Sequence, residues 1–127
     1  MDYRTEAPDL VRRFLTYIEA IKGKSGKTAQ EYYLDIRLFL RYMKKLRGIE
    51  PWDKPFEEIL IADVDADFIS KITLNDIYDF LNFLTKERPT QQNSRNTGYG
   101  LGAAARARKV ASIRAFFKYL TSKAMII

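Results

Sequence analysis

Hydrophobic side chains recur every three or four residues along most of this chain, which is the spacing of one face of an α-helix. Pro8 opens the first such stretch, and Thr28 with Glu31 forms a capping-box pattern at the start of the second. No stretch alternates in the way that is typical of strands. The pattern predicts an all-α fold, a four-helix bundle in one domain of residues 1–127, with helices over about 8–22, 29–47, 74–87 and 103–122.

Each predicted helix has one apolar stripe, which we expect to face a common core. The stripes contain Leu10, Phe14, Ile18 and Ile21 in the first helix, Tyr32, Ile36, Phe39, Met43 and Leu46 in the second, Leu74, Ile77, Leu81 and Leu84 in the third, and Val110, Ile113, Phe117 and Leu120, with Phe116 beside them, in the last.

Positive charge lies on the other side of two of these helices. Arg37, Arg41 and Lys44 form an outer stripe on the second helix. On the last helix, Arg108 and Ser112 share the side opposite the apolar face with three alanines, and further basic residues flank it. A stripe of small residues edged by guanidinium groups can approach a phosphate backbone closely, although a basic helix can equally be a solvated face.

The segment between the second and third helices is less regular. Pro51 and Pro55 interrupt helix there, and the apolar residues of 49–72 predict an ordered excursion with a short helical turn near 56–60. Residues 63–67 resemble the start of a calcium loop, but Phe68 replaces the required glycine, so no calcium site is expected. Thr73 with Asp76 predicts a second capping pair. Residues 90–102 are expected to form a flexible connection.

Composition excludes several chemistries. The chain of 127 residues has no cysteine and no histidine, which removes thiolate metal sites and the usual general base. We therefore expect no catalytic residue, no bound metal and no small-molecule cofactor. No apolar run reaches membrane-spanning length and no signal peptide opens the chain, so the cytoplasm is the expected location and no membrane partner is expected.

The net charge of +6 is unevenly distributed. Residues 1–47 carry +5, residues 48–82 carry −7, residues 83–102 carry +2 and residues 103–127 carry +6, which together give +6. Two basic segments around an acidic middle favour a polyanion such as double-stranded DNA as the partner. The candidate DNA-contacting residues are Lys24, Ser25, Lys27, Thr28, Arg37, Arg41, Arg106, Arg108, Lys109 and Arg114. The alternative is a protein-interaction domain that uses the acidic segment, whereas a helix-turn-helix regulator is disfavoured because no tight turn joins two helices.

Three motifs in order carry a family resemblance. Ser25-x-x-Thr28-x-x-x-Tyr32-x-x-Asp35-Ile36 in the second predicted helix, Thr73-x-x-Asp76-Ile77 in the third, and the run from Ala107 to Leu120 in the last resemble the N-terminal core-binding domain of tyrosine recombinases, the family of phage integrases and Xer-like proteins. The resemblance implies a SAM-like four-helix domain that grips one face of a DNA recombination site. It also implies that catalysis resides in a separate C-terminal domain absent from this chain, and that other recombinase protomers are partners through the full-length protein.

Overall fold

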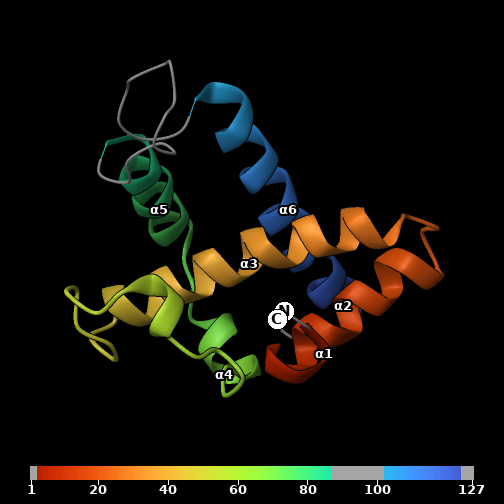
Figure 1. Cartoon of the computed structure of the whole chain (residues 1–127), viewed down its shortest axis with the longest axis horizontal. Coiled ribbons are helices and arrows are strands. Elements are labelled where there is room, and N and C mark those ends of the chain that lie inside the picture. Colours follow the sequence, from red (N-terminus) through yellow and green to blue (C-terminus); the bar gives the residue numbers. More distant parts are fainter. Residues whose placement is uncertain (1–2, 87–101, 124–127) are drawn as a thin grey trace.

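The computed structural model of the chain describes residues 3–86 and 102–123, and within them every regular element is helical (Figure 1). The elements are α1 (Tyr3–Glu6), α2 (Asp9–Ala20), α3 (Gly26–Leu46), the 3₁₀ helix η1 (Phe56–Glu58), α4 (Ala66–Ser70), α5 (Leu74–Lys86) and α6 (Ala103–Ser122). The all-α prediction is confirmed, and the four predicted helices correspond to α2, α3, α5 and α6. The helical turn expected near 56–60 is η1, whereas α1 and α4 were not predicted.

The longest helix, α3, organises the bundle. It contacts α2, α5, α6 and η1, and α6 also packs on α2 and α5. Figure 1 shows α3 across the middle of the molecule, with α5 rising from one half of it and α6 crossing it. The N-terminal halves of α3 and α6 diverge from this crossing.

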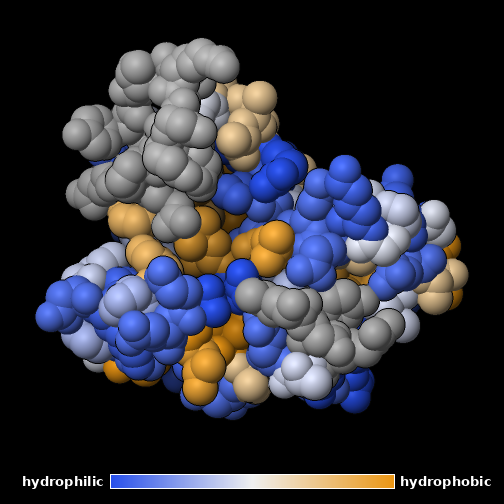
Figure 2. Space-filling model, in the orientation of Figure 1, coloured by the Kyte–Doolittle hydropathy of each residue, from blue (hydrophilic) through white to orange (hydrophobic). Residues whose placement is uncertain are grey.

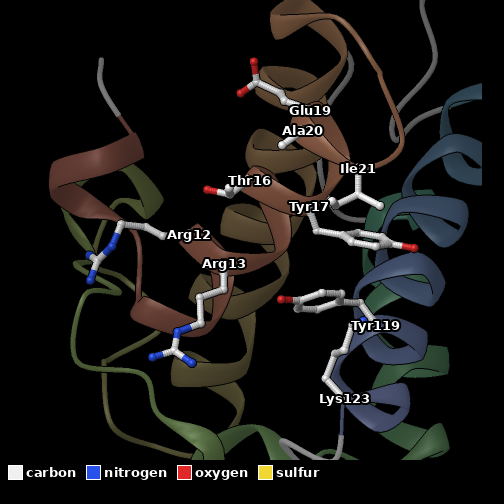
Figure 3. Close-up of a pocket in the computed structure, with 9 residues that line it drawn as sticks. All are labelled: Arg12, Arg13, Thr16, Tyr17, Glu19, Ala20, Ile21, Tyr119 and Lys123. Atoms are coloured by element: carbon white, nitrogen blue, oxygen red, sulfur yellow. The ribbon is translucent and has the colours of Figure 1, made fainter.

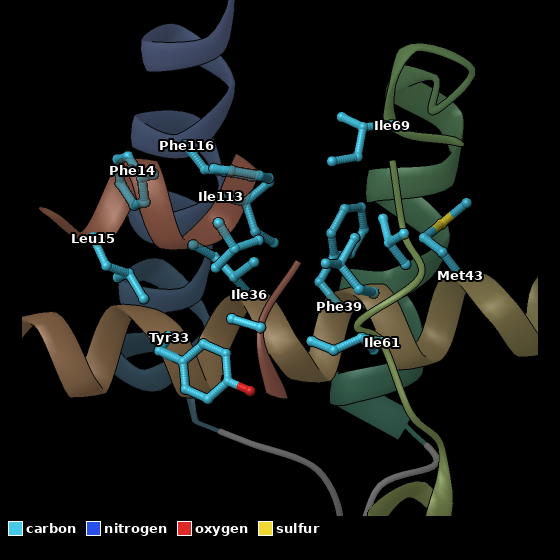
Figure 4. Close-up of a cluster of buried hydrophobic side chains, with 14 of the residues drawn as sticks. Phe14, Leu15, Tyr33, Ile36, Phe39, Met43, Ile61, Ile69, Ile113 and Phe116 are labelled. Atoms are coloured by element: carbon cyan, nitrogen blue, oxygen red, sulfur yellow. The ribbon is translucent and has the colours of Figure 1, made fainter. Parts of the chain in front are cut away.

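The core lies between α3 and the helices that pack around it (Figure 4). At one end, the rings of Phe14 in α2 and Phe116 in α6 meet edge to face, with centroids 5.4 Å apart. At the other end, the rings of Phe39 in α3 and Phe80 in α5 meet in the same way at 5.1 Å. Ile113 of α6 is buried near Phe116 and Ile36 in Figure 4, and all these residues belong to one apolar core along α3.

Several expected core positions are corrected by the structure. Ile21 is 72% exposed because α2 ends at Ala20, and Val11 lies in the core instead. Leu46 and Leu74 are also exposed, since each lies at the end of its helix, beyond the neighbouring elements. The apolar stripes were therefore located correctly along the chain, but their ends extend past the packed part of the bundle.

The apolar face of α6 is also rotated relative to the prediction. Phe116 and Ser112 are buried, whereas Phe117 and Val110 are only half-buried. The predicted stripe and the observed stripe share Ile113 and Leu120, and differ in which flank faces α3. A buried polar group on α3, described below, accounts for Ser112 facing inward.

Side-chain caps begin α3 and α5, and the cap of α3 differs from the prediction. Ser25, not Thr28, caps α3: its Oγ accepts a hydrogen bond from the Thr28 backbone N–H at 3.1 Å, so the helix begins at Gly26. The Thr73–Asp76 capping box is confirmed, because each side chain accepts from the other residue's backbone N–H, at 2.9 and 3.2 Å. Gly23, at φ +68°, forms the left-handed turn that separates α2 from α3.

Candidate nucleic-acid interface

A buried carboxylate lies where α6 crosses α3. Asp35 of α3 is fully buried, and α6 supplies all three of its side-chain partners. Arg108 Nη2 and Lys109 Nζ both donate to Oδ1, at 2.8 and 2.7 Å, and the Ser112 hydroxyl donates to Oδ2 at 2.8 Å. A buried carboxylate needs such partners, because an unpaired charge in the interior is strongly destabilising.

The two cations of this cluster differ in exposure. The side chain of Arg108 is 51% exposed, whereas that of Lys109 is 12% exposed. One negative charge is therefore shared by two positive charges, and the excess of one positive charge reaches the surface through Arg108. Of the two predicted DNA contacts, Arg108 is accessible to a ligand in this structure and Lys109 is largely covered.

The outward face of α6 is small and positively charged. Ala107, Ala111, Arg114 and Lys118 are all exposed on it, one or two turns apart. Within the described part of the chain, neither Arg114 nor Lys118 forms an ion pair with an acid. The small residues leave room for a ligand between the cations. Arg106, also predicted to contact DNA, is half-buried at the N-terminal end of the same helix.

The α2–α3 turn supplies a second group of predicted contacts. Lys24, Ser25 and Lys27 are exposed there, and Thr28 is half-buried with its Oγ1 accepting from Ser25 Oγ at 3.1 Å. Lys27 and Asp35 are eight positions apart in α3, so they are separated by about 12 Å along the helix axis. Hydrophilic residues predominate on the visible surface near the N-terminal half of α3, whereas hydrophobic residues gather toward α5 (Figure 2). In Figure 1 the N-terminal halves of α3 and α6 diverge like the two arms of an angle, and the α2–α3 turn lies at the far end of the α3 arm. The bond from Arg108 places Asp35 at the crossing, which is the vertex of this angle.

Arg37 and Arg41, also predicted to contact DNA, do not lie on this surface. Arg37 follows Asp35 by two residues, a rotation of about 200° around a helix, so the two side chains lie on nearly opposite sides. Arg37 pairs with Glu6 at 2.8 Å, and Arg41 Nε donates to the Ile59 carbonyl at 2.9 Å. Burial, together with the neighbouring charge of Arg37, lowers the pKa of Arg41. These arginines fasten other segments to α3.

Glu6 is the acceptor that holds α1 against α3. The Tyr33 hydroxyl and Arg37 both donate to it. Burial alone would raise the pKa of Glu6, but these two hydrogen bonds and the charge of Arg37 outweigh burial and lower it. Burial and the Glu6 carboxylate raise the pKa of Tyr33. The cluster is structural and lies away from the Asp35 vertex.

The C-terminal part of α3 holds the 49–72 excursion through its basic residues. Lys44 is buried and donates to the Leu60 carbonyl and to Asp63, while Lys45 donates to the Trp52 carbonyl. The expected outer stripe of Arg37, Arg41 and Lys44 is therefore wrong as an outer face. Carbonyl groups of the irregular excursion need donors, and lysine and arginine side chains of α3 provide them.

An open groove lies between α2 and the C-terminal part of α6 (Figure 3). The rings of Tyr17 and Tyr119 are 4.9 Å apart in it, and Lys123 Nζ lies 5.7 Å from the Tyr17 ring. Tyr119 follows Arg108 by eleven residues, about 16 Å along the helix, so the groove is separate from the Asp35 vertex. It is lined by Arg12, Arg13, Thr16, Tyr17, Glu19, Ala20, Ile21, Tyr119 and Lys123.

Residues 3–86 and 102–123 offer neither a metal site nor a membrane span. They contain no group of three or more His, Cys, Asp and Glu side chains placed to hold a metal ion. None of their helices combines the length and apolarity needed to cross a membrane. Residues 90–101, most of the stretch expected to form a flexible connection, lie outside the described residues.

Sequence reasoning missed Asp35 as a functional residue. Its position gave a usable signal, because it directly precedes Ile36 on the side of α3 that packs against other helices. An acid at a buried position requires cations from elsewhere in the fold, and α6 is the basic, acid-free helix available. Ser112 was placed on the outer face, and the buried Asp35 carboxylate explains why it points inward.

Comparison with known proteins identifies one clear relative. The chain is 44% identical over 120 residues to a protein described as "Tyrosine recombinase XerC" from Caldanaerobacter subterraneus subsp. tengcongensis. The alignment covers 94% of this chain and 31% of that protein, so the chain spans about a third of the length of the relative. No family model matches the chain, and no solved structure matches it.

Proposed function

We propose that this chain, which is 44% identical to part of a tyrosine recombinase, is the N-terminal DNA-binding module of such a protein and grips the recombination site during DNA integration or recombination. The observation that carries the proposal is the acid-free outer face of α6, with exposed Arg114 and Lys118 and half-exposed Arg108. Phosphate contacts of this kind supply most of the sequence-independent affinity for DNA.

The arrangement of the positive charges supports a duplex as the ligand. Lys24 and Lys27 lie in the turn before α3 and at its start, and Arg108 lies where α6 crosses α3. Arg114 and Lys118 lie further along α6, on the C-terminal side of the crossing. Cations distributed over two diverging helices can contact phosphates at several points of a DNA backbone, which fixes orientation as well as affinity. In the proposed complex, Ser25 and Thr28 serve mainly to place the start of α3, whose backbone N–H groups favour a phosphate nearby.

We further propose that this chain by itself binds DNA without cleaving it. It has neither histidine nor cysteine. Tyr33 lies beside Arg37, but burial and its hydrogen bond to Glu6 raise the pKa of Tyr33 and so disfavour the phenolate that a nucleophile needs. Strand cleavage would then require the part of a recombinase that this chain does not match, and the other recombinase protomers would be partners of the whole protein. A nicked suicide substrate tests this point, since a covalent adduct formed by this chain alone would contradict it.

Salt dependence of duplex binding tests the DNA-binding proposal. Fluorescence anisotropy with a labelled duplex, repeated over a series of salt concentrations, gives the slope of log K against log salt. If about five phosphates are contacted, the slope should be about −4.5. No binding at low salt, or a flat response to salt, would contradict the proposal.

A matched pair of lysine variants separates a localised interface from net charge. Lys118 and Lys71 are both exposed, but Lys71 lies at the end of α4, next to Asp67 with which it pairs. Lys118→Ala should weaken binding and make the slope shallower by about one unit, whereas Lys71→Ala should change neither. Equal losses for the two variants would mean that the attraction is a property of net charge alone.

A protein-interaction role for residues 48–82 remains the second candidate. The observation that favours it is the exposure of Ile49, Trp52 and Leu60 within this acidic segment. Exposed apolar side chains in one segment are typical of docking surfaces. The anisotropy titration distinguishes the candidates, because a domain that acts only through this segment would not bind the duplex at low salt.

A further inference from the structure

We propose that Asp35 is a positioning residue for DNA binding: it fixes Arg108 for phosphate contact, while Lys109 serves as its permanent counter-ion. The proposal rests on the proposed DNA-binding function and adds a division of roles among residues that the sequence treated alike. It assigns Arg108 to the DNA, and it assigns Asp35, Lys109 and Ser112 to holding Arg108 in place.

The Asp35 carboxylate is enclosed by the protein and bonded to α6. Asp35 has no exposed surface, so its charge can act on a ligand only through the residues bound to it. Arg108 Nη2 lies 2.8 Å from Oδ1, and the Ser112 hydroxyl, one turn further along α6, occupies Oδ2 at 2.8 Å. Both carboxylate oxygens therefore accept hydrogen bonds from α6, which fixes the orientation of the carboxylate and the place where it binds Arg108.

Arg108 keeps hydrogen-bond donors that do not bind Asp35. A guanidinium group has five N–H donors in a rigid planar fork, and the bond to Asp35 uses one edge of it. Nη2 is the atom that bonds Asp35, and the side chain is still 51% exposed, so a ligand can reach part of the group. A planar group anchored on one edge can donate to a phosphate with the other edge. Binding then costs less conformational entropy, because the long side chain is already ordered.

Two cations, Arg108 and Lys109, share the Asp35 carboxylate, and each has a different role. If Arg108 were the sole partner of Asp35, a phosphate would compete with the buried carboxylate for its charge. Lys109 Nζ, 2.7 Å from the same Oδ1 and only 12% exposed, stays with Asp35 whatever binds Arg108. Asp35 therefore remains compensated when the guanidinium is shared with DNA. Lys109 carries charge into the cluster but does not itself reach the ligand.

A double-mutant cycle between Asp35 and Arg108 tests the proposal. Asp35→Asn keeps the side-chain shape and an acceptor for Ser112, but it releases both cations. Duplex affinity is measured per folded molecule, with the folded fraction determined by circular dichroism under the same conditions. We expect Asp35→Asn to weaken binding about two- to tenfold, the range set by the cost of ordering one long side chain. In an Arg108→Ala background the same substitution should have no effect on affinity.

The competing effect has the opposite sign. Removing the carboxylate raises the net charge by one, and pure Coulomb attraction would then tighten binding and steepen the salt slope. Asp35→Asn binding that equals or exceeds the wild type, or an equal loss in the Arg108→Ala background, would overturn the positioning role. If the wild type itself fails to bind the duplex, the DNA-binding function has failed instead, so the two failures are distinguishable.

Two further variants keep the test decisive if Asp35→Asn does not fold. Arg108→Lys preserves charge but replaces the planar fork with a single ammonium group, so it should weaken duplex binding several-fold with little change in stability. Unchanged affinity for Arg108→Lys would overturn the proposal. Lys109→Met should lower the melting temperature and leave the salt slope unchanged, and a slope reduced by about one would show that Lys109 contacts DNA after all.

Discussion

Replacing Phe116 with alanine tests the packing that orients α6. The ring is 1% exposed and meets the ring of Phe14 edge to face at a centroid distance of 5.4 Å. Truncating a buried phenylalanine costs about 3–5 kcal/mol of unfolding free energy, through lost transfer free energy and the cavity that remains. The edge-to-face pair puts the expected loss in the upper part of that range. A domain of this size has roughly 5–15 kcal/mol of stability, so the variant should still fold at room temperature.

Thermal unfolding followed by circular dichroism measures this loss. For a domain of this length, each kcal/mol corresponds to roughly 3–5 °C, so a loss of about 4–5 kcal/mol should lower the melting temperature of Phe116→Ala by about 12–25 °C. Phe117→Ala provides the matched control on the adjacent position, because Phe117 is only half-buried and should lose about half as much. A larger loss for Phe117 than for Phe116 would mean that α6 presents the other flank to α3. The assignment of Arg108 to the α3–α6 crossing would then fail as well.

Three further predictions concern the elements that frame the interface. Ser25→Ala should cost about 1 kcal/mol by urea unfolding because it removes the α3 cap, and a larger loss for Thr28→Ala would restore Thr28 as the cap. Lys44→Met should cost about 1–3 kcal/mol, since the Leu60 carbonyl loses its donor, and no loss would mean that water replaces the lysine. Hydrogen bonds hold the pKa of Glu6 below its ordinary 4.5, so its stabilisation is present above about pH 4.5 and is lost as pH falls through the lower folded-state pKa. Glu6→Gln should therefore be less stable than the wild type at neutral pH, with a difference that shrinks in acid, and a pH-independent difference would contradict this.

Periodicity predicted the four long helices because each buries a continuous stripe. The ends of α3, α5 and α6 fall within a few residues of the expected ones, since caps and glycines are local signals. The short helices α1 and α4 were not predicted. A helix of four or five residues has too few positions to show a period, and α1 depends on a contact between Glu6 and Arg37 that lies 31 residues away in sequence.

The candidate site was predicted only in part, because the sequence does not show which basic residues are exposed and which are buried. A basic residue looks the same in sequence whether it faces solvent or donates to a carbonyl of a distant segment. Lys44 is buried because Leu60 and Asp63 fold back onto it, and nothing near Lys44 in the sequence indicates this. Arg114 carried no such partner in the described residues, so its exposed position on α6 agrees with the prediction that the outer face of α6 is charged.

The buried acid shows which kind of information was missing. Asp35 joins two helices through residues 73, 74 and 77 positions away, so its role depends entirely on how α6 crosses α3. The sequence motif that contains Asp35 pointed to the family, but the pairing with Arg108, Lys109 and Ser112 required the fold. Local patterns therefore predicted the elements, and the crossing of α3 and α6 determined which cations remain available to a ligand.

Mapping a bound duplex onto the protein by NMR tests the central claim most directly. Isotope-labelled protein is titrated with an unlabelled duplex at low salt, and the backbone amide shifts are followed residue by residue. We predict that the largest changes fall on residues 24–28 and on 106–118, with little change around Arg37, Arg41 and α4. Changes concentrated at Arg37 and Arg41, or on the acidic segment 48–82, would contradict the assignment of the DNA interface to the angle between α3 and α6.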